Sequence, residues 1–297
     1  MKPTYGDKVM TSIIYVLLAI LAFAAFYPFW NAAVISFNNG TDTMRGGVTF
    51  WPRQFSLENY KVVFEDSRLV NGFIISILRT VVGTLASIAA TAIFAYGMSK
   101  SELIGRKPYM VMCIITMYFS GGLIPSFLLI RELGMFNTFW VMVIPRLISV
   151  WNMIIFRTFF KGIPAGLEES ARIDGCSNWG VLFKIVLPLS GPVLATLSLF
   201  TAVYHWNDWF TPSIYISNTD LMPIQTKLQQ ILNSNIMSEQ MAQLDAAAQG
   251  RMNKMRAVTT KSLSMATMMV ATLPILCVYP FLQKYFVKGV MVGSLKE

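Results

Sequence analysis

The sequence predicts an all-α membrane protein with six transmembrane helices, and three observations lead to this fold class. Charged residues make up only 13% of the 297 residues, about half of the share that is usual in a soluble chain. Apolar residues make up 55%, which is more than one water-soluble core can bury. The few charges are also separated by uncharged runs that reach the length of about 20 residues needed for a helix to cross a bilayer. These features exclude a soluble enzyme, and the low charge excludes a disordered chain.

The expected elements follow one another along a single transmembrane domain, residues 11–297, which begins after a short inner tail, residues 1–10. The six spans are expected at residues 11–37, 70–99, 108–131, 137–160, 181–210 and 262–286. The start of the first span imitates a secretory signal, because Lys2 and Lys8 precede an apolar run with a small-x-small ending. The apolar residues continue to Phe37, however, which favours an uncleaved span.

Two arginines are expected inside the membrane, and the fourth span carries one of them near its middle. Two apolar runs, 133–145 and 147–156, are joined through Arg146 and are predicted to form one helix. A mid-membrane arginine costs about 2.5–3.5 kcal/mol, so Arg146 should face the protein interior or a wet cavity. Arg79 is the second such cation, in span two. Because no acidic residue lies in the interior of any assigned span, a partner subunit or an anionic ligand is expected to supply both counter-charges.

The placement of Lys and Arg predicts that both termini are cytoplasmic. Whole-chain totals on the two sides are nearly balanced, but the rule gives most weight to short loops. Lys100, Arg106 and Lys107 lie in one short loop, whereas the turn at 131–137 contributes only Arg131. The net charge of +9 is then explained by an inner surface that faces anionic lipid, and we expect no nucleic-acid partner.

Residue types that support catalysis are scarce. Cys113, Cys176 and Cys277 have neither a disulfide pattern nor a metal-ligand spacing, and the single histidine, His205, is expected to pack or to form a hydrogen bond. No metal site is therefore predicted. The chain also lacks the G-x-x-x-x-G-K-[ST] loop, so any ATPase must be a separate polypeptide.

The segment 161–188 between spans four and five contains strong local signals. Pro164 is placed to start a short helix, and Glu168 and Glu169 follow in the turns where the helix dipole favours anions. Gly175 can end this helix in the left-handed conformation, and Ser177 can cap the next one. That second helix is predicted to carry Trp179, Leu182, Phe183 and Val186 on one side. A short helix across the inner mouth is suited to transmit the motion of an inner partner.

This segment resembles the EAA loop of the membrane subunits of binding-protein-dependent ABC importers, whose pattern is E-A-A-x3-G-x9-I-x-L-P. The matching residues are Glu169, Ala171, Gly175, Ile185, Leu187 and Pro188, and Ser170 replaces the middle alanine. The chain is most similar to the carbohydrate class, which includes the smaller maltose permease subunit and permeases for pectin- or alginate-derived oligosaccharides. Weaker matching stretches are Trp51-Pro52, Phe55–Tyr60, Ala95-Tyr96, Phe119–Pro125, Asn137–Trp140, Trp206-Asn207 and a glycine-rich tail at 289–296.

The resemblance implies a type I ABC importer permease that moves an oligosaccharide, including one that contains uronate, across the bacterial cytoplasmic membrane. It implies a second homologous permease, two ATPase subunits that carry ATP and Mg²⁺, and an extracytoplasmic solute-binding protein. The chain itself would be neither an enzyme nor a cofactor carrier. Glu169 would pair with a basic residue of the ATPase, and Leu167, Ala171 and Ile173 would contact its groove. The expected coupling set is Glu168, Glu169, Ser170, Ala171, Asp174, Gly175, Leu187 and Pro188.

Residues of the substrate path are less specific. The candidates are Arg79, Arg146, Trp206, Asn207, Asp208 and Trp209, which mix aromatic faces with hydrogen-bonding groups. An interfacial aromatic belt explains the tryptophans equally well, and a permease–permease interface is an alternative role for the arginines. The outer segments 38–69 and 212–261, with helical spacing at Pro223–Leu232, suit either docking of a binding protein or covering of the outer mouth.

Three alternative functions are compatible with parts of the sequence. An ABC permease for another solute class has the same coupling loop. An ion-coupled secondary transporter would need a mid-membrane titratable group and inverted repeats, neither of which the sequence offers. A membrane enzyme would rest only on His205 and Asp208. Proline kinks are expected in the last two spans, at Pro188, Pro192, Pro274 and Pro280.

Overall fold

The computed structural model describes residues 5–244 and 259–294. These residues form helices joined by loops, together with one isolated β-bridge between Asn38 and Phe55. The predicted all-α fold class is therefore confirmed. The chain divides into two compact units: unit 1 comprises residues 1–70 and 228–273, and unit 2 comprises residues 71–227 and 274–297. Parts of the N-terminal tail and of the 212–261 segment, at 1–4 and 245–258, lie outside the described residues, as do 295–297.

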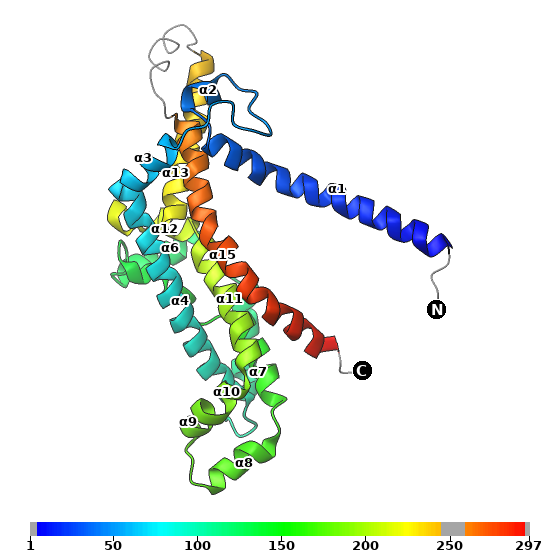
Figure 1. Ribbon diagram of the computed structural model, residues 1–297. Coiled ribbons are helices and arrows are strands. Elements are labelled where there is room, and N and C mark those ends of the chain that lie inside the picture. Colours follow the sequence, from blue (N-terminus) through cyan, green and yellow to red (C-terminus); the bar gives the residue numbers. More distant parts are fainter. Residues whose placement is uncertain (1–4, 245–258, 295–297) are drawn as a thin grey trace. The chain divides into compact units, whose positions relative to one another are not determined.

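Unit 1 contains a long apolar helix and the connection that follows it. Its elements are α1 (Tyr5–Ser36), α2 (Gly40–Met44), α3 (Glu58–Glu65), most of α13 (Ile224–Leu244) and the first part of α15 (Thr260–Ser294) (Figure 1). Its small core joins Val34, Ile35 and Val48 to Trp30 and Met265. No residue in the most apolar stretch of α1 is buried within the chain, as expected of a helix that faces lipid or another membrane helix.

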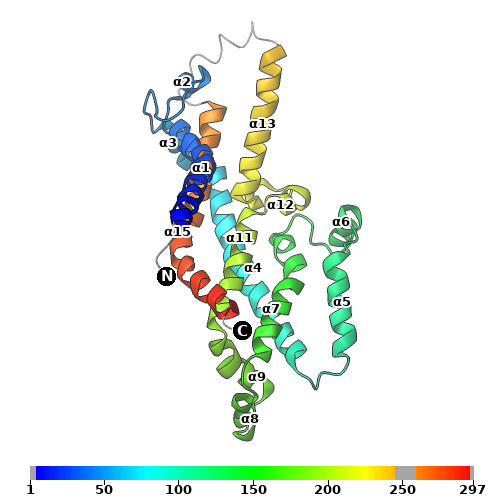
Figure 2. The same cartoon turned by 90° about the vertical axis from the view of Figure 1, so that its right-hand side faces the viewer.

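Unit 2 is a helical bundle, and its described residues include a larger and a smaller apolar core. Its elements are α4 (Ser67–Ser99), α5 (Arg106–Tyr118), α6 (Leu123–Glu132), η1 (Phe139–Met142), η2 (Ile144–Arg146), α7 (Val150–Lys161), α8 (Ala165–Ile173), α9 (Asn178–Val181), the π-helical turn η3 (Leu182–Val186), α10 (Leu187–Leu189), α11 (Gly191–Asn207), α12 (Phe210–Tyr215) and η4 (Thr219–Leu221). The larger core includes Ala95, Met153, Phe156 and Leu197, from α4, α7 and α11, which run side by side (Figure 2). The smaller core joins α6, η1 and α12 through Ile130, Met142 and Tyr215.

Within the part of the chain that the structure describes, the helices long and apolar enough to cross a membrane are α1, α4 and the Thr260–Cys277 part of α15. Three further spans exist only if each of three bent helix pairs is counted as one. The bends are 114° between α5 and α6, 48° between Phe139–Arg146 and α7, and 83° between Asn178–Leu189 and α11. The prediction of six spans therefore holds by length and composition, but three of the six are not continuous helices.

The prediction of one continuous helix through Arg146 is wrong, and the span at 108–131 is also interrupted; glycine, proline and capping residues explain the breaks. Gly122 precedes α6 at φ 89°, a conformation that ends regular helical geometry. In the next span, Pro145 lies in the short 3₁₀ turn η2, and Ser149 starts α7 anew by accepting the Asn152 N–H at 3.3 Å. Arg146 therefore lies just before a helix and not in the middle of one.

The expected kink in span five is confirmed, whereas α15 passes through Pro274 and Pro280 as one helix. The break falls at Ser190, between Pro188 and Pro192. Neither proline can donate a backbone hydrogen bond, so the helix cannot continue regularly through this pair. The Val186 carbonyl, just before the break, accepts both the Ser190 hydroxyl at 2.6 Å and the Ser190 N–H at 3.0 Å.

Candidate functional site

The predicted coupling helix is present as α8, and its end has the expected left-handed glycine. Gly175 has φ 82°, and its N–H donates to the Arg172 carbonyl at 3.0 Å. The Cys176 N–H donates to the Ala171 carbonyl at 2.9 Å. These two bonds form a Schellman motif, which satisfies carbonyls that the end of α8 leaves unpaired. A side chain at position 175 would strain this turn, so glycine is required by the backbone itself.

The helix after the corner begins as predicted, but its faces differ from the prediction. Ser177 caps it by accepting the Gly180 N–H at 3.2 Å. Trp179 and Phe183 are exposed and stack on each other at 6.1 Å between ring centroids, whereas Leu182 and Val186 are buried. The expected single apolar face is therefore wrong. The reason is η3, in which the Leu187 N–H reaches back to the Leu182 carbonyl and widens the turn.

Side chains of α8 divide between two faces. Glu168 and Ala171, three residues apart, face this chain, and Ala171 is only 7% exposed within the larger core of unit 2. Glu169 and Ile173, four residues apart, face away, and Ile173 is 86% exposed. Leu167, Ser170 and Asp174 are exposed as well. Ala171 is thus used inside this chain, and the accessible residues for a groove contact are Leu167 and Ile173.

An ion pair fastens α8 to the end of α4. The Lys100 ammonium donates to the Glu168 carboxylate, and it also lies 4.3 Å from the centre of the Tyr96 ring. A second, longer pair joins Arg172 to Glu102 at 3.6 Å. Glu168 was predicted from the sequence, but Lys100 as its partner and Glu102 as the partner of Arg172 were not. The sequence contained one indication of these contacts: the short basic loop and the coupling segment were both expected on the inner side of the membrane.

A second cluster joins α4 to the end of α11 through Arg79 and Asp208. The Arg79 guanidinium donates to the Asp208 backbone carbonyl at 2.6 Å and to the Asp208 carboxylate. The other carboxylate oxygen accepts the Thr211 N–H at 3.0 Å. The side chains of Arg79 and Asp208 are only 1% and 8% exposed. The expectation that a partner subunit or a ligand supplies the counter-charge of Arg79 is therefore wrong, because Asp208 supplies it.

His205 lies in the same contact, as a packing residue. It is buried against Gly83 of α4, where an added Cβ would lie 2.7 Å from the His205 Nε2 atom. Glycine at this position lets the two helices approach closely. Leu197, Thr201 and His205, spaced four residues apart, form the buried face of α11.

Arg146 has a different environment from Arg79. Its side chain is exposed, and its guanidinium carbon lies 4.5 Å from the centre of the Tyr204 ring. Side chains of α4 support the backbone next to it: the Ser87 hydroxyl donates to the Arg146 carbonyl and the Thr91 hydroxyl to the Leu147 carbonyl, both at 3.4 Å. These long bonds partly satisfy the carbonyls at the break between η2 and α7.

The four neighbouring substrate-path candidates after Tyr204 also separate. Trp206 is buried and meets Phe73 edge to face at 5.6 Å, and Asp208 is taken by Arg79. Asn207 and Trp209 are exposed. Adjacency in the sequence therefore did not imply a shared site, because successive helical residues point in different directions.

In unit 1 the connection between α1 and α3 is held by a polar cluster. The Asn38 amide donates to Asp42 and to Thr43, each at 3.0 Å, and the Arg53 guanidinium pairs with Asp42 at 3.0 Å. The hydrogen bond from Asn38, followed by the contacts with Arg53, holds the pKa of the Asp42 carboxyl below its usual value of 3.8. Asn59 ties the cluster to α15 by accepting the Ser262 hydroxyl at 2.8 Å.

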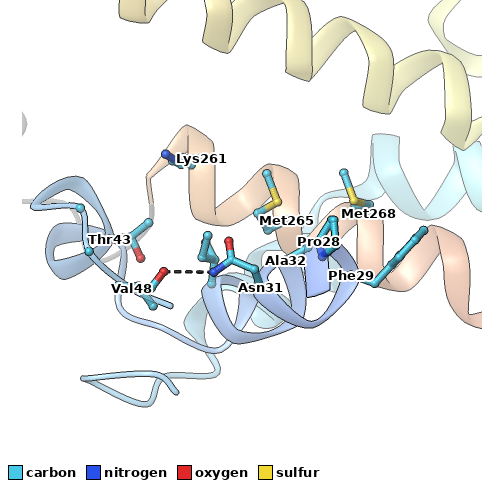
Figure 3. Close-up of a pocket in the computed structure, with 12 residues that line it drawn as sticks. Pro28, Phe29, Asn31, Ala32, Thr43, Val48, Lys261, Met265 and Met268 are labelled. Carbon is cyan, nitrogen blue, oxygen red and sulfur yellow. Dashed lines mark hydrogen bonds between the residues drawn. The ribbon is translucent and has the colours of Figure 1, made fainter. Parts of the chain in front are cut away.

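Unit 1 also contains an open, mostly apolar cavity of about 510 Å³. Figure 3 shows its wall, with Asn31 donating to the Val48 carbonyl at 3.1 Å and Met265 and Met268 on α15. Lys261 is the charged residue of the lining. The cavity belongs to a different unit from Arg79 and Arg146 and includes none of the residues that the sequence selected.

This combination of bent apolar spans and an exposed, anchored helix with a glycine corner defines a membrane permease subunit. The chain belongs to the family of binding-protein-dependent transport system inner membrane components, whose model matches residues 1–292.

Two proteins of Bacillus subtilis (strain 168) are similar to it. The polygalacturonan/rhamnogalacturonan transport system permease protein YtcP is 39% identical over 293 residues, which cover 98% of this chain and 99% of that protein. Protein LplC is 39% identical over 269 residues, which cover 91% of this chain and 88% of that protein. Among solved structures, a chain of a bacterial ABC transporter involved in import of the acidic polysaccharide alginate superposes with a TM-score of 0.85. It is 27% identical, with 95% of this chain and 98% of that chain covered.

Proposed function

We propose that this chain is one of two permease subunits of an ATP-driven importer that moves uronate-containing oligosaccharides across the bacterial cytoplasmic membrane. Family membership and the transport of acidic polysaccharide by similar proteins support this assignment. The ATPase, with its ATP and Mg²⁺, would be carried by two separate subunits, and an external binding protein would deliver the sugar. Both termini are proposed to be cytoplasmic, on the short-loop charge argument.

The observation that carries the proposal is the two-faced geometry of α8. One face is fixed to this chain by Ala171 in the core and by the Glu168–Lys100 pair. The other face offers Glu169 and the apolar Ile173 to a partner. A helix that is held on one side and free on the other transmits a partner's movement into α4 and α7. We assign Glu169 to a basic residue of the ATPase and Leu167 and Ile173 to its groove.

Docking of the binding protein is assigned to segments 38–69 and 212–261. The polar cluster around Asn38 and Asp42 gives the first of these a fixed shape. From it Trp51 and Phe55 project into solvent, although Phe55 also stacks on Phe37 at 5.7 Å. Exposed aromatic residues on a rigid loop are well suited to protein contacts, because few rotamers are lost on binding.

The assignment is tested by reconstituting the chain with its partner permease, the ATPase and the binding protein in proteoliposomes. Oligogalacturonate should stimulate ATP hydrolysis and accumulate inside, whereas a neutral oligosaccharide of the same length should do neither. Stimulation by the neutral sugar alone would place the chain with an importer for another solute class. Transport driven by an ion gradient without ATP would overturn the ABC assignment.

Coupling is tested in the same preparation with Gly175→Val. The substitution should leave the chain in the membrane but lower sugar-stimulated hydrolysis severalfold, because the strained turn misplaces α8. Gly97→Ala is the matched control, since Gly97 lies within α4 and an added Cβ there has no neighbour within 4 Å. Unchanged stimulated turnover in Gly175→Val would remove the assignment of this corner to coupling.

A further inference from the structure

The two membrane arginines are held in different ways. Arg79 is fully buried, and Asp208 neutralises its charge. Arg146 is exposed, and among residues 5–244 and 259–294 no carboxylate lies within 4.0 Å of its guanidinium. We propose that Arg146 binds the carboxylate groups of the sugar during translocation, and that Arg79 has a structural role only. This inference rests on the proposed function and assigns its substrate specificity to one residue.

The location of Arg146 supports a role in binding. It ends η2, immediately before the break from which α7 starts. Non-helical backbone within a membrane protein is tolerated only where protein covers it or where it lines a wet cavity, and interrupted helices commonly form substrate sites. Here α4 supplies partners for this backbone through Ser87 and Thr91. The break is thus stabilised by α4, and the exposed Arg146 side chain contacts Tyr204 of α11.

Tyr204 holds the guanidinium without neutralising it. A cation that lies over an aromatic ring is attracted to the ring face. The ring does not accept hydrogen bonds from the five N–H groups that lie in the plane of the guanidinium, whereas a carboxylate would accept them. The edge of the guanidinium stays available for a bidentate contact, which is the geometry that suits a carboxylate. An ion pair such as that of Arg79 would leave no such capacity.

The two faces of α11 explain why Tyr204 is available for this purpose. Leu197, Thr201 and His205 turn one face toward α4 and α7, with the Asn152 amide donating to Thr201 at 3.2 Å. Tyr204 lies on the adjoining face, and Asn207, exposed and three residues further on, lies on the same face. A cation, a ring and an amide side by side provide what a sugar acid requires: charge, an apolar surface and a partner for hydroxyl groups.

The test compares uptake of trigalacturonate with uptake of its methyl ester, which has the same sugar frame without the charge. In reconstituted wild-type importer the free acid should be taken up. Arg146→Gln should lower its uptake about ten- to a hundredfold, the loss expected for a charge-assisted hydrogen bond, and should leave ester uptake little changed. Arg146→Lys should retain an intermediate rate for the acid, because it keeps the charge but not the bidentate geometry.

Other outcomes decide against the inference. Equal losses for acid and ester in Arg146→Gln, accompanied by poor recovery of the complex, would show that Arg146 contacts the partner permease instead. Where the wild type accepts only the acid, equal rates for Arg146→Gln and Arg146→Lys would overturn charge recognition. Failure of the wild type to take up either sugar would refute the proposed function itself, which separates the two failures. Arg79→Gln is the comparison variant: if Arg79 has only a structural role, it should reduce uptake of both sugars equally, and a selective loss of acid uptake would contradict that role.

Discussion

Arg79 and Asp208 form a buried ion pair that joins α4 to the end of α11, although 129 residues separate them in the sequence. The Arg79 guanidinium also donates to the Asp208 backbone carbonyl at 2.6 Å, so it fixes both the charge and the position of the chain at the end of the helix. Both residues were expected in the substrate path. Because they neutralise each other in a buried pair, we interpret Arg79 and Asp208 as structural residues.

Removing one member of the Arg79–Asp208 pair should strongly destabilise the protein. Arg79→Gln and Asp208→Asn should each lower the free energy of unfolding by about 3–5 kcal/mol, because each leaves a buried charge without its partner. The double variant should lose clearly less than the sum of the two. Thermal unfolding of the purified protein in detergent measures all three. As a control, Arg68→Gln breaks the exposed Arg68–Asp66 pair and should cost about 0–1 kcal/mol. Additive losses would contradict a direct pairing.

An added methyl group at Gly83 should separate α4 from α11. In Gly83→Ala the new Cβ would lie 2.7 Å from His205 Nε2, so the buried imidazole or one of the two helices must shift, at a cost of about 1–3 kcal/mol. Combining it with His205→Ala makes room for the methyl group and should add little to the loss caused by His205→Ala alone. The measurement is again thermal unfolding, with Gly97→Ala as the control that meets no neighbouring atom. Full additivity of the two substitutions would mean that the contact does not limit the packing.

Charge-reversed variants of the two adjacent glutamates of α8, Glu168 and Glu169, should respond differently to the compensating substitution Lys100→Glu. Glu168→Lys should reduce sugar-stimulated ATP hydrolysis severalfold, because its positive charge would face Lys100, and Lys100→Glu should restore much of the activity. Glu169→Lys should also reduce stimulated hydrolysis, since Glu169 is assigned to the ATPase, but Lys100→Glu should not restore it. Rescue of both variants, or of neither, would contradict the division of α8 into an inward and an outward face.

Acid should weaken the segment around Asp42. The folded-state pKa of Asp42 is lowered, so its contribution to stability is present above the unfolded value of 3.8 and is lost as the pH falls through the lower folded value. Asp42→Asn should therefore be less stable than wild type near pH 6, and the difference should shrink as the pH approaches 3. Melting temperatures across this range test the prediction. Curves that stay parallel would show that Asp42 has the same pKa in both states.

The fold class and the coupling segment could be predicted from the sequence, because they depend on overall composition and on residues close together in the chain. Low charge and long apolar runs determine a helical membrane protein, because unpaired backbone groups are too costly in lipid for other structures. Local signals determined the coupling segment: Gly175 supplies the left-handed turn and Ser177 the cap, and each acts within four residues. The resemblance of this segment to the EAA loop pointed to the family in which the chain belongs.

Only the tertiary structure decided which distant side chains meet and where apolar runs break. Lys100 and Glu168 are 68 residues apart, and Arg79 and Asp208 are 129 apart, so no periodicity connects them. The breaks at Gly122, before Ser149 and at Ser190 interrupt runs that are long enough for continuous spans. Hydropathy measures the transfer of side chains into lipid and is insensitive to helix direction. The partners that neutralise a buried charge, or that satisfy a broken helix, exist only once the helices have packed.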